Sequence, residues 1–175
     1  MDLDLFSRDD KVDLEAVRRE LLGRFPDATV VAMTDAAMTV RLAGTEIDVI
    51  RYPYPPVGPL VEGPGGFPVA GLEDLAAMKL AAVARRGIRR DFWDLYEILR
   101  SKGGPSLTEA ALAYRRRFGR TEADLYHVAR ALAYFGDADA EPAFPKGLTA
   151  KKWAQIKRFF AKQAPELLVS TEPER

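Results

Sequence analysis

The chain has 175 residues, no cysteine, one histidine, and 26 basic against 26 acidic residues. This composition excludes disulfides, cysteine-ligated zinc, thiol catalysis and multi-histidine metal sites, and the zero net charge does not indicate a nucleic-acid or membrane partner. A hydrophobic content of 47% is enough for the core of one domain or of two compact subdomains. No stretch approaches the roughly 18 to 20 apolar residues of a membrane span, and the acidic N-terminus is unlike a signal peptide, so we expect a cytoplasmic protein without a membrane partner.

The first seven residues, MDLDLFS, are predicted to form a strand. Because side chains alternate along a strand, Leu3 and Leu5 should face the core while Asp2 and Asp4 share the other face. Two carboxylates close together on a rigid element are the hard oxygen donors that Mg²⁺ binds. A D-x-D pattern by itself is weak evidence, and a frayed acidic chain end is the alternative.

The next part of the chain is predicted to be a scaffold helix over residues 11–25, after which the hydrophobic period changes from helical to alternating. Ala43 and Gly44 have the composition of a tight hairpin turn. Three strands are therefore expected, at residues 28–33, 38–42 and 45–52.

Asp48 lies on the last of these strands and shares a face with Glu46 and Ile50. One interpretation makes Asp48 a third metal-binding carboxylate, on a strand that neighbours Asp2 and Asp4. The other interpretation is an exposed polar face on which Asp48 pairs with Arg41 across the hairpin, since cross-strand charge pairs are common.

Residues 53–68 contain six prolines and four glycines and are predicted to have no regular secondary structure. We interpret them as a hinge or an active-site loop between an N-terminal α/β part and a C-terminal helical part. The predicted organisation is an α/β part at residues 1–58, a Pro/Gly-rich loop at 59–70 and a helical region at 71–175.

Residues 71–101 have strong helical periodicity and predict two amphipathic helices that meet at a break at residues 86–88. The packing pattern does not require Lys79 in the first helix, nor Asp91 and Asp94, which share one face of the second. One interpretation is a solvated lysine with carboxylates that favour the positive end of a helix dipole. Another is a structural salt bridge from Lys79 to Asp91.

The remaining residues predict a helix that begins with a capping box at Ser106, a helix that begins at Thr121, and a loop at residues 136–147. A last helix begins near Thr149 and has inward apolar residues and a basic outer face. Ordinary helix packing explains this pattern, and an RNA-facing surface is the alternative.

The pattern K-L-x-A-hhh-R-x-x-x-R-D-F-x-D-L, in which h is an apolar or small residue, resembles the helical signature of the AbiEii/AbiGii nucleotidyltransferase toxin family. The N-terminal D-L-D-L-F is similar to the strand that carries the metal-binding carboxylates in that family. The helical pattern is formed here by Lys79, Leu80, Ala82, Arg86, Arg90, Asp91, Phe92, Asp94 and Leu95.

The resemblance implies an α+β fold, with a small mixed sheet and helices like those of nucleotidyltransferases, followed by a helical C-terminal region. It implies a Mg²⁺-dependent transfer of a nucleotide from an NTP to an acceptor such as a tRNA 3′ end or other RNA, and an antitoxin encoded nearby. Transfer to a small molecule is an alternative within the same fold.

Residue roles follow from the same resemblance. The metal ligands are Asp2, Asp4 and Asp48. The catalytic residues are Asp2, Asp4, Lys79 and Asp91. The nucleotide-binding residues are Arg86 and Arg90, with Asp94 as their supporting carboxylate.

One departure from the family pattern concerns the segment before the D-x-D strand. Family members carry a glycine-containing G-G-[ST] or G-S segment there, whose backbone N–H groups bind the triphosphate. This sequence begins at the D-x-D itself. The expectation is therefore either a start further upstream or a shortened relative, and the alternative function is a catalytically degenerate domain that binds a nucleotide or a protein without turnover.

Overall fold

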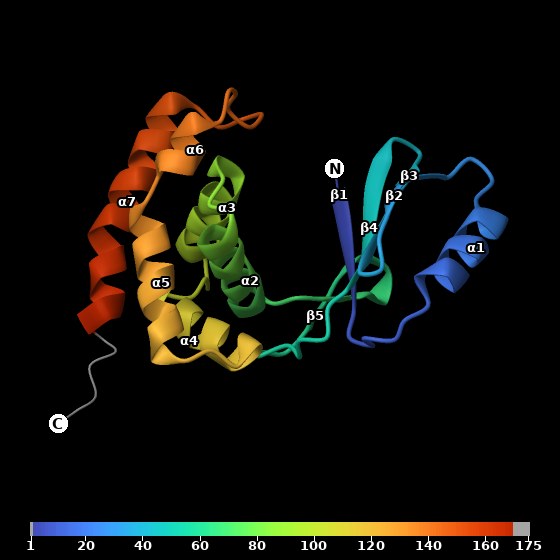
Figure 1. The fold of residues 1–175 in the computed structure, drawn as a ribbon, viewed down its shortest axis with the longest axis horizontal. Helices are drawn as coiled ribbons and strands as arrows, with labels where there is room; N and C mark the ends of the chain where they lie inside the picture. The colour runs from blue at the N-terminus through green and yellow to red at the C-terminus, as the bar shows by residue number, and fades with distance from the viewer. Residues whose placement is uncertain (1, 170–175) are drawn as a thin grey trace. The chain divides into compact units, whose positions relative to one another are not determined.

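The computed structural model describes residues 2–169, and it consists of two compact units that divide between Pro55 and Pro56. The first unit contains a sheet and one helix. The second is mostly helical (Figure 1). None of the helices in the described part of the chain is both long and apolar enough to cross a membrane.

The sheet of the first unit has the order β1-β4-β3-β2 and is mixed, because β1 pairs with β4 in parallel and the other pairs are antiparallel. The predicted hairpin turn is confirmed, since Ala43 and Gly44 both have positive φ, of 49° and 79°. The strands are β1 (Asp2–Ser7), β2 (Thr29–Met33), β3 (Ala37–Leu42) and β4 (Thr45–Arg51).

Helix α1 (Leu14–Arg24) begins at Asp13, whose carboxylate accepts a hydrogen bond from the backbone N–H of Ala16. It packs its apolar side on β2, β3 and β4 and leaves β1 outside the core. Leu3 and Leu5 lie on the same face as the buried Val49, as predicted, but they are not part of the core, because these side chains are 44% and 38% exposed. The single helix packs on three of the four strands, and β1 is an edge strand outside that contact.

The Pro/Gly-rich segment is more ordered than the sequence predicts. It contains the antiparallel pair β5 (Val61–Glu62) and β6 (Pro68–Val69), joined through the short 3₁₀ turn η1 (Pro64–Gly66). The backbone N–H of Gly63 donates to the carbonyl of Phe67 and closes the turn. Proline is tolerated here because the pairing is only two residues long on each strand.

The second unit contains the two predicted helices of residues 71–101, which are α2 and α3. They meet at Gly87, whose φ of 52° lets the chain reverse between them. The segment at 136–147 was predicted to be a loop, but it begins with the short helix α6, because Ala138 is fully buried in the core. The helices are α2 (Leu72–Arg85), α3 (Arg89–Arg100), α4 (Leu107–Phe118), α5 (Glu122–Ala133), α6 (Gly136–Ala140) and α7 (Ala150–Val169).

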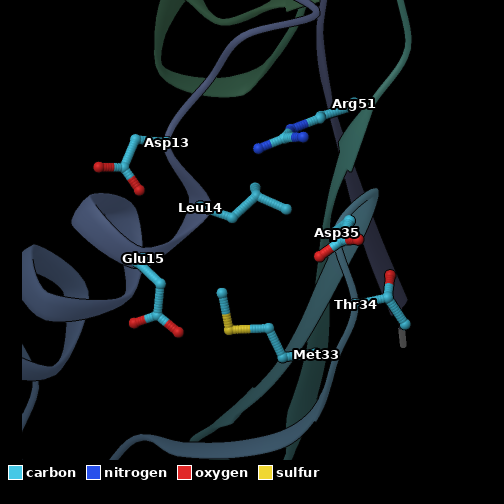
Figure 2. A pocket seen from close by; sticks show the side chains of 7 residues that line it. All are labelled: Asp13, Leu14, Glu15, Met33, Thr34, Asp35 and Arg51. Carbon is cyan, nitrogen blue, oxygen red and sulfur yellow. The ribbon is translucent and has the colours of Figure 1, made fainter.

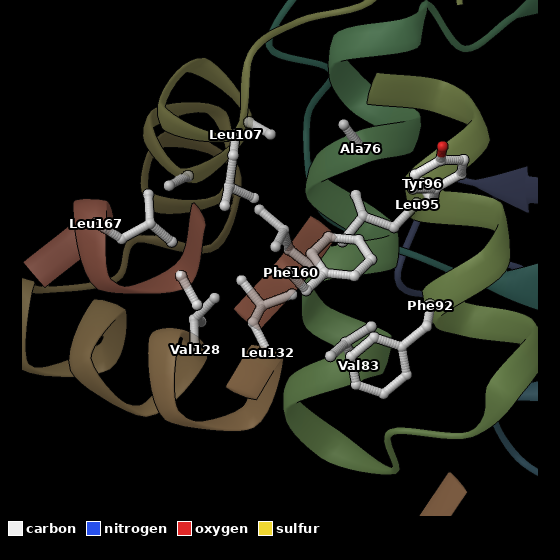
Figure 3. Close-up of a cluster of buried hydrophobic side chains, with 14 of the residues drawn as sticks. Ala76, Val83, Phe92, Leu95, Tyr96, Leu107, Val128, Leu132, Phe160 and Leu167 are labelled. Carbon is white, nitrogen blue, oxygen red and sulfur yellow. The ribbon is translucent and has the colours of Figure 1, made fainter. Parts of the chain in front are cut away.

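The core of the helical unit is built around the ring of Phe92, which is fully buried (Figure 3). This ring lies 5.7 Å from that of Phe160 and 5.8 Å from that of Trp153, both on α7. Such edge-on contacts between buried rings add to the free energy of apolar burial. Helix α3 is therefore held firmly against α7, and its polar face is fixed with it.

Two buried arginines connect distant parts of this unit. The Arg89 guanidinium donates to the backbone carbonyls of Asp139, Glu141 and Ala143, which ties the start of α3 to the segment around α6. The second arginine, Arg117 on α4, forms an ion pair with the buried carboxylate of Asp74.

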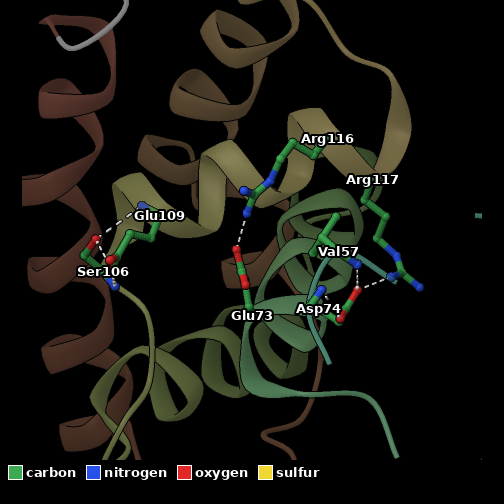
Figure 4. Close-up of polar contacts among 8 residues, drawn as sticks. Val57, Glu73, Asp74, Ser106, Glu109, Arg116 and Arg117 are labelled. Atoms are coloured by element: carbon green, nitrogen blue, oxygen red, sulfur yellow. Dashed lines mark hydrogen bonds and ion pairs between the residues drawn. The ribbon is translucent and has the colours of Figure 1, made fainter. Parts of the chain in front are cut away.

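The Asp74 carboxylate also accepts hydrogen bonds from the backbone N–H groups of Val57 and Gly58, at 2.9 and 3.2 Å (Figure 4). It therefore anchors the start of the second unit to α2. One residue earlier on each helix, Glu73 and Arg116 form a parallel ion pair that is exposed to solvent.

Candidate functional site

A cluster of charged side chains lies where α2 and α3 pack together. The Nζ atom of Lys79, midway along α2, is 2.6 Å from a carboxylate oxygen of Asp94 and 4.0 Å from one of Asp91. Asp91 and Asp94 are three residues apart on α3, so both point toward α2. The structure thus brings together three of the residues that the sequence singled out.

Arg86, at the C-terminal end of α2, completes the cluster. Its Nε and one terminal nitrogen bind the two carboxylate oxygens of Asp91 at 2.7 and 2.8 Å, a bidentate geometry. The Asp91 side chain is fully buried, whereas the Arg86 side chain is 58% exposed. The hydrogen bond to Asp91 raises the pKa of Arg86 above its usual value, which favours the charged guanidinium.

The predicted salt bridge between Lys79 and Asp91 is present at 4.0 Å, but it is not the shortest contact of either residue. The closest carboxylate to Lys79 is Asp94, and Asp91 is engaged mainly with Arg86. Arg90, the other predicted nucleotide-binding arginine, lies on the exposed side of α3. Asp91 therefore lies next to two cations, with Arg86 hydrogen-bonded to it and Lys79 at 4.0 Å. Both cations are accessible to solvent.

The strand carboxylates are in the first unit. Asp4 on β1 and Asp48 on β4 are direct partners in the parallel pairing, so they lie on one face of adjacent strands about 4.8 Å apart. This is the face opposite to the apolar side chains that α1 covers. Asp2 lies in β1, but its side chain is outside the part of the chain that the structure describes.

The alternative pairing of Asp48 with Arg41 is wrong. Arg41 forms its ion pair with Glu46, its direct partner in the hairpin, and Asp48 accepts a hydrogen bond of 2.5 Å from the hydroxyl of Thr39. Counting outward from the two-residue turn gives these pairs, so the sequence contained the signal. Thr39 is the supporting residue that the sequence interpretation missed.

Among the described side chains, no group of three or more histidine, cysteine or carboxylate residues is arranged to hold a metal ion. The pair of Asp4 and Asp48 still suits Mg²⁺, which is often bound through one or two carboxylates with waters and substrate phosphates in its other positions. The hydroxyl of Thr39 fixes the orientation of the Asp48 carboxylate, as supporting hydrogen bonds commonly do at metal sites.

A pocket of about 360 Å³ also lies in the first unit, between the start of α1 and the end of β2 (Figure 2). None of the predicted site residues lines it. Two of its charged groups already have structural roles, because Asp13 caps α1 and Arg51 donates to the carbonyl of Val12. The lining residues are Asp13, Leu14, Glu15, Met33, Thr34, Asp35 and Arg51.

Comparison with known proteins agrees with the sequence resemblance. Residues 1–172 match the family described as "Nucleotidyl transferase AbiEii toxin, Type IV TA system". A curated relative, "Uncharacterized protein aq_aa25" of Aquifex aeolicus (strain VF5), is 30% identical over 138 residues, which cover 73% of this chain and 59% of that protein. The chain thus aligns with less than two thirds of its relative, and no solved structure matches it.

The mixed four-stranded sheet with its helices and the helical C-terminal region form an α+β fold of the nucleotidyltransferase-like kind that was expected. The family match extends over nearly the whole chain and includes both the strand carboxylates and the α2–α3 cluster. The chain therefore belongs to the family of AbiEii nucleotidyl transferase toxins of type IV toxin–antitoxin systems.

Proposed function

We propose that this chain transfers a nucleotide from an NTP to a hydroxyl of an acceptor, with a tRNA 3′ end as the first acceptor to test. The observation that carries the proposal is the α2–α3 cluster, in which one buried carboxylate, Asp91, holds the Arg86 guanidinium and lies 4.0 Å from Lys79. A buried anion that fixes two solvent-accessible cations is an arrangement suited to binding a polyphosphate.

In the proposed reaction the acceptor hydroxyl oxygen attacks the α-phosphorus of the NTP. The bond from that phosphorus to the oxygen that bridges to the β-phosphate breaks, pyrophosphate leaves with the electron pair, and the hydroxyl proton is released to water. Bound Mg²⁺ would stabilise the negative charge that develops on the attacking and leaving oxygens. Asp4 and Asp48 are the described residues that would hold it, and Asp2 is the third proposed ligand.

Lys79 and Arg86 would bind the phosphate oxygens of the NTP. For Lys79 this means exchanging the carboxylate of Asp94 for a phosphate, which is feasible because both side chains are about one-third exposed, at 30% and 34%. Arg86 would keep its bonds to Asp91 and bind phosphate through the terminal nitrogen that Asp91 does not engage. Arg90, on the exposed side of α3, is proposed as a further phosphate contact.

Asp91 is proposed to position the cations and not to contact the nucleotide. Its side chain is fully buried and both of its oxygens accept hydrogen bonds from Arg86. A carboxylate in this state is a poor acceptor for the hydroxyl proton, because protonation would break the bidentate pair. This assigns Asp91 an indirect contribution to catalysis, through Lys79 and Arg86.

Family membership also implies a cognate antitoxin, because the family is described by its type IV toxin–antitoxin systems. We propose that expression of this chain slows growth and that a nearby antitoxin gene relieves the effect. Loss of growth inhibition in Lys79→Ala would connect the toxicity to the α2–α3 cluster.

A second candidate function is a degenerate domain that binds a nucleotide or a protein without turnover. One observation favours it: both Lys79 and Arg86 are already neutralised by carboxylates, Asp94 and Asp91. If those ion pairs are stronger than the contacts to a triphosphate, the cluster stabilises the packing of α2 against α3 and does not bind a nucleotide.

The deciding experiment incubates the purified chain with total tRNA, Mg²⁺ and each α-labelled NTP, and measures label in RNA. Lys79→Ala should abolish incorporation, whereas Lys102→Ala, an exposed lysine after α3, should leave it unchanged. Asp4→Ala and EDTA should abolish it as well. Incorporation that persists in Lys79→Ala would contradict the proposed role, and no incorporation with any NTP, alongside NTP binding by calorimetry, would favour the degenerate domain.

A further inference from the structure

Helix α7 is the most basic element in a chain that has no net charge. Between Ala150 and Pro165 it has no acidic residue. The helix therefore carries a concentrated positive charge that attracts anions. Its basic residues are Lys151, Lys152, Lys157, Arg158 and Lys162.

Two of these residues have a partner within the protein. Lys152 is 2.8 Å from a carboxylate oxygen of Glu97 on α3, and its ammonium lies 4.6 Å from the centre of the Tyr96 ring. Lys157 is 2.9 Å from a carboxylate oxygen of Asp139. These contacts attach α7 to α3 and α6, and both lysines are only partly exposed.

The other three basic residues point to solvent. Lys151, Arg158 and Lys162 are exposed, and none of them has a carboxylate partner among the side chains that the structure describes. They are spaced seven and four residues apart, which places them on one face of the helix. At 1.5 Å per residue this row of cations, here called the α7 stripe, extends over about 16 Å.

Contacts across α3 connect α7 to the α2–α3 cluster. Asp94 and Glu97 are three residues apart on α3, so they lie on the same side of it. Asp94 binds Lys79 on α2, and Glu97 binds Lys152 on α7. The proposed nucleotide-binding cluster and α7 therefore lie on either side of one exposed face of α3 within the helical unit.

We infer that the α7 stripe binds the phosphodiester backbone of an RNA acceptor. This inference rests on the proposed function, because it assigns the surface that would hold the acceptor while its end is modified. Lys151, Arg158 and Lys162 would neutralise phosphates and release condensed counterions, which is the main source of sequence-independent affinity for nucleic acids. Glu97 on the neighbouring α3 is occupied by Lys152 and by the indole N–H of Trp93, and Glu166, one turn beyond Lys162, is the acidic residue at the end of the stripe.

Two other kinds of partner fit this surface less well. A helix that lies on a membrane inserts its apolar face, but the apolar face of α7 is buried in the core through Trp153, Ile156 and Phe160. Protein interfaces are depleted in lysine relative to the rest of the surface, whereas two of the three residues of the stripe are lysines. RNA is therefore the polyanion that the observations favour.

The test measures binding of full-length protein to a fluorescent tRNA transcript by anisotropy, without NTP, at several salt concentrations. The stripe variant carries Lys151→Gln, Arg158→Gln and Lys162→Gln, which keep good helix formers at exposed positions. The matched control carries Arg8→Gln, Lys11→Gln and Arg19→Gln, which remove the same charge from exposed positions of the first unit.

The stripe variant should bind at least about tenfold more weakly, and the slope of log K against log salt should decrease by about 2 to 3, at 0.7 to 0.9 per phosphate contact. The control should bind like the parent. Equal binding by parent and stripe variant, or stripe-dependent binding to phosphatidylserine vesicles without RNA binding, would overturn the inference. Circular dichroism verifies that the variants are folded.

Lys79→Ala separates this inference from the proposed function. It should retain RNA affinity, because Lys79 is not part of the stripe, and it should lose nucleotide transfer. If the parent binds RNA through the stripe but transfers no nucleotide, the RNA surface stands and the proposed enzyme activity fails. If the parent transfers nucleotide and the stripe variant does so with an unchanged KM for tRNA, the RNA surface fails alone.

Discussion

The two parallel ion pairs between α2 and α4 allow a direct measurement of what burial does to a salt bridge in this protein. Asp74 and Arg117 are buried, with side chains 1% and 6% exposed, while Glu73 and Arg116, one residue earlier on each helix, are 37% and 59% exposed (Figure 4). Both pairs connect α2 with α4, and the two residues of each pair are separated by the same number of positions in the sequence. The pairs differ in solvent exposure, in their hydrogen bonds and in the acidic residue, which is Asp in the buried pair and Glu in the exposed one.

Replacing Asp74 with Asn removes the carboxylate from the buried ion pair with Arg117, which typically costs 3 to 5 kcal/mol, so we expect about 4 kcal/mol. The Asn side chain has one carbonyl oxygen for the backbone N–H groups of Val57 and Gly58, where the carboxylate has two oxygens. The matched change Glu73→Gln should cost about 0 to 1 kcal/mol, because an exposed pair is screened by water.

Urea unfolding followed by tryptophan fluorescence measures both changes. The two tryptophans of the chain, Trp93 and Trp153, are in the helical unit, so the signal reports on that unit and not on the sheet. The double variant Asp74→Leu with Arg117→Met should recover much of the lost stability, because it removes both charges together. If Asp74→Asn and Glu73→Gln reduce the free energy of unfolding equally, the reasoning is refuted.

Two further predictions concern α3 and the turn that follows it. The hydrogen bond from Lys152 holds the pKa of Glu97 below its ordinary value. This pair therefore stabilises the fold above pH 4.5, and the stabilisation is lost as the pH falls through the lowered pKa. Lys152→Met should raise the pKa of Glu97, which an NMR titration measures. A Cβ atom on Gly104 would lie 2.1 Å from the carbonyl oxygen of Ile98, so Gly104→Ala should reduce the free energy of unfolding by about 1 to 3 kcal/mol. Urea unfolding followed by circular dichroism measures this change. The control Gly23→Ala should not destabilise the protein, because a Cβ atom at that position would have no neighbouring atom within 4 Å.

Much of the fold could be predicted because its signals are local. The apolar period of α2 and α3, the capping box at Ser106 and the turn at residues 43–44 each depend on residues a few positions apart. These local signals predict the order of the helices along the chain and the segments that form the strands of the sheet. The short helix α6 was missed because five residues are too few for a periodic pattern.

The partners within the candidate site could not be predicted from spacing. Whether Lys79 meets Asp91 or Asp94 depends on how far α2 and α3 are rotated about their axes, which the whole core decides. The exposure of Leu3 had the same cause, because a strand pattern shows which residues share a face but not whether a helix covers that face. Long-range packing determines both outcomes.

The buried Arg89 has a consequence for how the segment around α6 tolerates sequence change. Its guanidinium binds main-chain oxygens of Asp139, Glu141 and Ala143, so these three bonds do not depend on the side chains at those positions. The Asp139 carboxylate also binds Trp153 and Lys157, and the Glu141 carboxylate accepts from the backbone N–H of Arg89, so of the three positions only Ala143 is exposed and free of such side-chain contacts. An insertion or deletion of one residue would displace the carbonyl groups and release the start of α3, so the length of this segment is more tightly constrained than its composition.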